Sequence, residues 1–62
     1  MNLTPRHREI ANLLMQGMSN KEIARVLGIA HGTVKVHLYE MFQRLNVTSR
    51  TKLVVKFLSD RP

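Results

Sequence analysis

Side chains able to recognise a partner are concentrated on one side of a helical pattern between residues 32 and 45. At about 100° of rotation per residue, this side carries a cation, methyl groups, a phenol and an amide. They belong to Lys35, Val36, Tyr39 and Gln43, with Gly32 at the start of the same side. A face that only meets water has little use for a valine, so we interpret this side as a contact surface.

The opposite side of the same pattern is predicted to be core, and it comprises Val34, Leu38, Met41 and Leu45, with Phe42 at the edge. A preceding pattern over residues 19–27 buries Ile23, Ala24 and Leu27. Gly28 supplies the positive φ that ends this preceding helix. Two short helices that meet across a tight turn predict a helix-turn-helix. The first and last helices are expected to add Ile10, Leu13, Leu14, Leu53, Val54 and Phe57 to the core, with Ala11 at its edge.

Start and stop signals divide the chain into four helices. The predicted ranges are about 5–16, 20–27, 32–45 and 49–59. The expected N-caps are Thr4, Ser19, and either Thr48 or Ser49. Glu22 completes a capping box with Ser19, and Asn46 suits a left-handed helix end. Residues 1–62 are therefore predicted to form one all-α domain of four helices.

The charge balance points to an anionic partner. Ten Lys and Arg residues against four Asp and Glu give a net charge of +6 and an isoelectric point near 11.0. Nucleic acid is the first candidate, ahead of an anionic membrane surface and an acidic protein. The absence of cysteine fits a reducing compartment, and the sequence shows neither a signal peptide nor a membrane span. We expect a cytoplasmic protein.

No group of residues predicts catalysis. The sequence offers no convergent acid and base, no nucleophile beside a base and no phosphate-binding glycine loop, so we do not expect an enzyme. His7, His31 and His37 are assigned to different elements, with no carboxylate or thiol seen at ligand spacing. The sequence therefore predicts no metal site and no cofactor.

The fourth helical pattern has three stripes where a surface helix needs two. Beside its core and polar stripes, a weakly apolar stripe carries Thr51, Val55 and Leu58. Such a stripe could pair with a second copy of the chain across a two-fold axis. Scattered surface apolar residues without a function remain the alternative.

Several stretches together resemble one family. They are Leu3–Arg6, Gly17–Ala24, Leu27–Ile29, Gly32–His37, Asn46–Val47 and Ser49–Thr51. In order and without gaps, from Leu3 to about Leu58, they resemble the LuxR-type DNA-binding domain, also called GerE-like, of the NarL and FixJ response regulators. This resemblance implies a third helix in the DNA major groove and pairing through the last helix.

The resemblance also implies a place in a larger protein. Such a domain usually forms the C-terminus of a bacterial transcription regulator, behind a receiver or a ligand-binding domain. The implied partners are duplex DNA, a second copy of the chain and RNA polymerase. Activation and repression are both compatible with the resemblance.

The resemblance assigns Lys35, Val36 and Tyr39 to base edges. Their chemistry agrees, because a lysine donates to guanine O6 and N7 while a valine packs on a thymine methyl. His31 and Gly32, at the start of the same helix, are added to this base-contacting set.

The resemblance also assigns residues to the DNA backbone. These expected phosphate contacts are Asn20, Lys21, Thr33 and His37. Asn20 and Lys21 begin a helix, where side chains and backbone N–H groups together hold a phosphate. Arg44 and Arg25 are further candidates, for which a solvated surface role is the alternative, and His37 could instead be a packing residue.

Three sites depart from the family pattern. His7 replaces the usual Glu, so the capping box with Thr4 is expected to lose its reciprocal half, at a cost of about 0.5–1 kcal/mol. Ala30 and His31 replace Ser and Glu, which removes an N-cap hydroxyl and brings His31 towards a base or phosphate. Tyr39 stands where a basic or amide side chain is common, so its base preference does not carry over.

Two other readings stay open. A promoter-binding sigma-factor region also carries Glu-Ile-Ala and Gly-Thr-Val, here at residues 22–24 and 32–34. It typically continues with Lys-Ser-Arg, where this chain has Lys35-Val36-His37, and lacks a helix like 49–59. Outside DNA binding, the domain could be a basic adaptor for an acidic protein surface.

Overall fold

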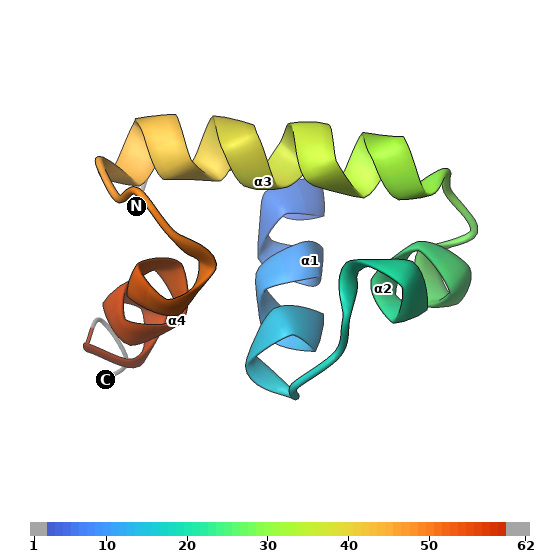
Figure 1. Ribbon diagram of the computed structural model, residues 1–62, viewed down its shortest axis with the longest axis horizontal. Helices are drawn as coiled ribbons and strands as arrows, with labels where there is room; N and C mark the ends of the chain where they lie inside the picture. The colour runs from blue at the N-terminus through green and yellow to red at the C-terminus, as the bar shows by residue number, and fades with distance from the viewer. Residues whose placement is uncertain (1–2, 60–62) are drawn as a thin grey trace.

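The computed structural model describes residues 3–59, which form an all-α fold of four helices (Figure 1). The helices are α1 (Pro5–Met15), α2 (Asn20–Leu27), α3 (His31–Leu45) and α4 (Arg50–Ser59). The predicted fold class is confirmed, and each predicted helix end lies within one residue of the observed one. The long α3 lies across one end of α1, with α2 below its N-terminal part and α4 below its C-terminal part. None of the described helices combines the length and apolar character needed to cross a bilayer.

One core joins all four helices. Its buried members are Ile10, Ala11, Leu14, Ile23, Ala24, Val34, Leu38, Met41, Leu53 and Phe57. The predicted core residues Leu13, Leu27, Phe42, Leu45 and Val54 are half-buried around it. Ala11, expected at an edge, is only 2% exposed because α1 packs against α2, α3 and α4. The stripe of α3 that was predicted to face inward is therefore confirmed.

The start of α1 corrects one expectation. The Thr4 hydroxyl accepts a hydrogen bond from the His7 backbone N–H at 3.1 Å, and His7 Nδ1 accepts one from the Thr4 N–H at 3.2 Å. The capping box is thus complete, and the prediction that His7 breaks its reciprocal half is wrong. An imidazole nitrogen can replace the usual carboxylate because it also offers an acceptor at the right reach.

The joints between the helices follow the sequence signals. Gly28 has φ +67° at the end of α2, and Asn46 has φ +55° at the end of α3. Ser49 caps α4 through its hydroxyl, which accepts the Lys52 N–H at 3.1 Å. No side chain caps α3, where Ala30 occupies the N-cap position. These short joints fix the angles at which the helices meet.

The capping box of α2 predicts a specific pH dependence. The Ser19 backbone N–H and then the Ser19 hydroxyl hold the pKa of the Glu22 carboxyl below its usual value. A lowered folded-state pKa adds stability that is complete above the unfolded pKa of about 4.3 and is lost as pH falls through the folded-state pKa. Glu22→Gln should therefore lower the melting temperature at pH 7, and the difference from the parent should vanish in acid.

Thermal denaturation from pH 7 to pH 3 measures this effect. Glu9→Gln is the matched control, because Glu9 lies at the surface in an ion pair with Arg6 at 3.6 Å, away from the helix caps. A gap between Glu22→Gln and the parent that stays constant across this pH range would show that ionised Glu22 does not strengthen the cap.

Candidate nucleic-acid interface

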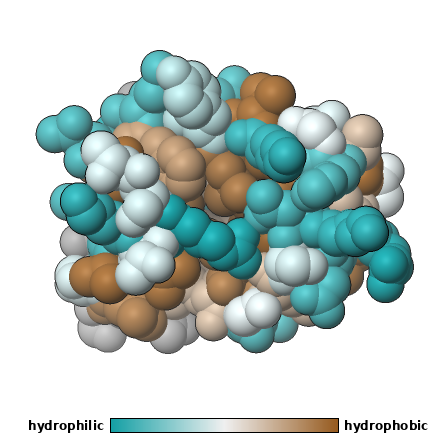
Figure 2. All heavy atoms as spheres, viewed as in Figure 1, coloured by the Kyte–Doolittle hydropathy of each residue, from teal (hydrophilic) through white to brown (hydrophobic). Residues whose placement is uncertain are grey.

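The outward side of α3 carries the residues predicted to touch a partner. Val36 is 57% exposed and Tyr39 62% exposed, and Lys35, which directly precedes Val36, is exposed as well. Gly32 is also exposed, and a Cβ added there would meet no atom within 4 Å. On the face of the molecule in Figure 2, polar and apolar side chains are interleaved. The start of this helix therefore leaves room for close approach of another molecule.

Two shallow grooves lie beside this surface. The first runs along the start of α2 and is lined by Gly17, Ser19, Asn20, Lys21, Glu22, His31 and Arg50. The second reaches the outward side of α3 and is lined by Asn20, Lys35, Leu38, Tyr39, Phe42 and Arg50. Asn20 and Arg50 line both grooves. The structure thus brings the predicted phosphate contacts Asn20 and Lys21 next to the predicted base contacts of α3.

Arg50 is the residue of this region that sequence reasoning missed. Its Nη1 donates to Asn20 Oδ1 at 2.7 Å, and its Nη2 donates to the Met18 backbone carbonyl. A guanidinium suits this role because its planar fork reaches two acceptors at once. Arg50 ties the start of α4 to the start of α2, and Asn20 keeps its amide N–H groups for a partner. The Ser49-Arg50-Thr51 motif was the available signal, yet its role depends on a contact 30 residues away.

The other predicted phosphate contacts differ in exposure. Lys21, Thr33, Arg25 and Arg44 are all exposed. His37 is different, because its side chain is 25% exposed and its Nδ1 atom is buried. A phosphate contact from His37 would therefore have to use the other ring nitrogen, Nε2.

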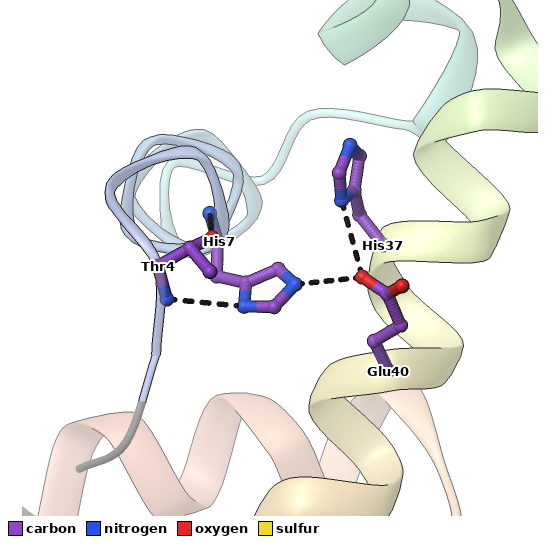
Figure 3. Close-up of polar contacts among 4 residues, drawn as sticks. All are labelled: Thr4, His7, His37 and Glu40. Carbon is purple, nitrogen blue, oxygen red and sulfur yellow. Dashed lines mark hydrogen bonds and ion pairs between the residues drawn. The ribbon is translucent and has the colours of Figure 1, made fainter.

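His37 belongs to a polar cluster between α1 and α3, which we call the His7–Glu40–His37 cluster (Figure 3). His7 is only 1% exposed, and its Nε2 lies 2.9 Å from Glu40 Oε1. Since His7 Nδ1 accepts the Thr4 N–H, Nε2 carries the ring proton and donates it to Glu40. This hydrogen bond holds the pKa of the Glu40 carboxyl below its usual value, against the opposing effect of desolvation.

His37 approaches the same carboxylate without an aligned hydrogen bond. Its Nδ1 lies 3.4 Å from Glu40 Oε1, a distance that fits an ion pair when the ring is protonated, but Nδ1 has no hydrogen-bond partner. The two imidazole rings meet edge to face at 5.5 Å. The statement that no carboxylate accompanies the histidines is therefore wrong. Glu40 follows His37 by three residues on α3, and folding brings His7 to both.

The fold and the surface of α3 define a helix-turn-helix domain. Residues 1–57 match the family of bacterial regulatory proteins described as the luxR family, and the chain belongs to this family. The predicted resemblance is confirmed, and the family match together with the presence of α4 separates the chain from a sigma-factor region.

Among its curated relatives is the nitrate/nitrite response regulator protein NarP of Escherichia coli K12, which is 46% identical to this chain over 59 residues. The matched residues make up 95% of this chain and 27% of NarP. The CsgBAC operon transcriptional regulatory protein of the same organism is 52% identical over 52 residues, covering 84% of this chain and 24% of that protein. The chain thus spans about a quarter of the length of these relatives.

Solved structures show the same fold. One is a chain from the crystal structure of the anti-activator RapF complexed with the response regulator ComA DNA binding domain. It superposes on this chain with a TM-score of 0.82 and 38% sequence identity. The match covers 86% of this chain and 91% of that chain. The response regulator StyR gives a TM-score of 0.79 and 47% identity, covering 86% of this chain and 27% of StyR.

The position of Arg50 predicts a structural role that is measurable. Arg50→Ala should lower the free energy of unfolding by about 1–3 kcal/mol, because Asn20 Oδ1 and the Met18 carbonyl lose a charged donor. Arg50→Lys should recover only part of this loss, since an ammonium cannot reproduce the fork. Urea denaturation measures both, with Lys56→Ala on the exposed side of α4 as the control. Equal stability of Arg50→Ala and the parent would mean that this contact does not hold α4 to α2.

Proposed function

We propose that this chain binds duplex DNA sequence-specifically, as the DNA-binding domain of a bacterial transcription regulator. The observation that carries the proposal is the division of α3 into a buried side and an exposed side. Val34, Leu38 and Met41 fix the helix in the core, while Lys35, Val36 and Tyr39 face outward. An α-helix fits the DNA major groove, where such a side reaches base edges.

The exposed side of α3 offers chemically different contacts to bases. The Lys35 ammonium donates to guanine O6 and N7, and the Val36 methyl groups pack on a thymine methyl. Tyr39, one turn after Lys35, adds a hydroxyl that donates to a base or to a phosphate. His31 and Gly32 stand at the start of the helix, where the lack of a side chain at Gly32 permits close approach. These residues would select the DNA sequence.

Phosphate contacts would fix the position of α3 in the groove. Asn20 and Lys21 begin α2, where backbone N–H groups and the helix dipole also favour an anion. Thr33, Arg44 and the Nε2 edge of His37 supply the contacts from α3 itself. The net charge of +6 adds attraction to any DNA sequence, and this part of the affinity falls with salt.

Pairing through α4 would place two copies on neighbouring half-sites. Val55 is 55% exposed and Leu58 53% exposed, and Thr51 is exposed one turn before Val55. In Figure 2 apolar atoms gather at the lower left of the view, in the region of α4. Burying these side chains against a second copy would remove apolar area from water. Two α3 helices would then enter successive major grooves of an inverted or direct repeat.

Selection from a pool of random duplex DNA, at two salt concentrations, tests the proposal as a whole. Enrichment of a two-part motif with fixed spacing would support specific binding by a pair. If the chain binds DNA without enriching any sequence, and this binding is lost at the higher salt, then the binding is nonspecific and electrostatic. The assignment of base reading to α3 would then be wrong.

The division between base and phosphate contacts predicts two kinds of variant. Lys35→Ala and Val36→Ala should each reduce the discrimination between the selected and a scrambled duplex by about 1–3 kcal/mol. Lys21→Ala should instead weaken both duplexes equally and lower the salt slope by about one unit. Fluorescence anisotropy over a salt series measures both quantities. If Lys35→Ala behaves like Lys21→Ala, the assignment of base reading to Lys35 is mistaken.

Self-association through α4 has its own test. Val55→Glu should abolish concentration-dependent association, because pairing would bury an unpaired carboxylate. Sedimentation velocity over a concentration series compares it with the parent and with Lys56→Glu, which changes the charge of the same helix on its polar stripe. If Val55→Glu sediments like the parent at every concentration, α4 is not the pairing surface.

A further inference from the structure

We propose that the His7–Glu40–His37 cluster is a binding site for one zinc ion, held between the start of α1 and the middle of α3. The three side chains bring Nε2 of His7, Nδ1 of His37 and a Glu40 carboxylate oxygen within 4.8 Å of one another. The site faces α1 and involves none of the base-contacting residues of α3. It shares His37 with the proposed phosphate contacts, but the zinc ion would take Nδ1 while a phosphate would take Nε2.

The distances within the cluster are close to those of a metal site. Ligands at about 2.0–2.1 Å from a tetrahedral zinc ion lie about 3.3 Å from one another. Glu40 Oε1 is already 2.9 Å from His7 Nε2 and 3.4 Å from His37 Nδ1. The two nitrogens lie within 4.8 Å of each other, and the His37 side chain, at 25% exposure, is not fully buried.

The donor types also favour zinc. Two imidazole nitrogens and one carboxylate oxygen form a set that zinc uses, with a fourth position left for water. The Glu40 side chain is 43% exposed, so the cluster lies at the edge of the core and not at its centre. The carboxylate supplies the negative charge that a divalent ion needs in a basic domain.

One atom of the cluster lacks a hydrogen-bond partner among residues 3–59. His37 Nδ1 is buried without a hydrogen bond, although it points towards Glu40 (Figure 3). Buried polar atoms are nearly always paired, so an atom without a partner requires an explanation. A metal ion bound to Nδ1 would provide its missing partner.

Metal binding would change the capping box of α1. Zinc on Nε2 of His7 moves the ring proton to Nδ1, which then no longer accepts the Thr4 N–H. The Thr4 N–H and the protonated Nδ1 would then be two facing donors. Thr4 is exposed, so its N–H can turn to water, but Nδ1–H lies on a side chain only 1% exposed and would need a new acceptor, a cost that zinc binding must exceed. The other half of the box, from the His7 N–H to the Thr4 hydroxyl, is kept. Loading of the site should therefore be visible at the Thr4 amide.

Titration of the untagged chain with zinc chloride, in the absence of DNA, tests the site. We expect one saturable site by calorimetry and a melting temperature that rises with free zinc, since ligand that binds only the folded state stabilises it. Glu40→Gln and His37→Gln should each weaken binding by at least about tenfold. Glu40→Gln keeps an oxygen that accepts from His7, so it preserves the fold while removing the charged ligand.

Matched controls separate the site from adventitious binding. Glu9→Gln and His31→Gln each remove one residue of the same type outside the cluster, and zinc affinity should stay at the parent value. On saturation, NMR should show shifts of the ring nitrogens of His7 and His37 and of the Thr4 amide. The proposal is overturned if the parent shows no saturable binding, if Glu40→Gln binds like the parent, or if His31→Gln loses affinity as much as His37→Gln.

Discussion

The burial of one side of α3 is the constraint on which the other features of this domain depend. Val34, Leu38 and Met41 are at most 5% exposed, and they leave the opposite side of the same helix to solvent. Because a helix turns 100° per residue, fixing these three positions also fixes where Lys35, Val36 and Tyr39 project. α1, α2 and α4 all pack against α3 and hold it in place. The packing of the core therefore determines which residues of α3 are exposed.

Local sequence signals predicted most of this architecture because they act over a few residues. Caps at Thr4 and Ser19 need only the next helical turn, and the positive φ of Gly28 and Asn46 needs only the residue itself. Hydrophobic spacing then identified the inward stripe of each helix. Exposure of Val36 and Tyr39 followed from the same periodicity.

Local signals and hydrophobic spacing could not predict the contacts between segments that are distant in the sequence. His7 and Glu40 are 33 residues apart, and Arg50 and Asn20 are 30 apart, so no spacing rule joins them. His7 was expected to break the capping box with Thr4, a local error, because its imidazole also offers an acceptor at that reach. Its burial and its hydrogen bond to Glu40 arise only when α1 meets α3. Glu40 was overlooked for a similar reason, although His37 stands three residues before it. Tertiary packing decided the role of each of these polar groups.

The N-terminus of α3 has no side-chain cap, and this affects both the stability of the domain and what can bind at this helix end. Ala30 gives this helix no side-chain cap, whereas α1 and α2 both begin with a complete capping box. An N-cap hydroxyl or carboxamide adds about 0.5–2 kcal/mol, so the free domain lies below the stability it could attain. Because no side chain caps this end, its first N–H groups can donate to an anion in place of a cap. A thermostabilised version made by capping α3 would therefore occupy the position that an approaching phosphate would otherwise fill.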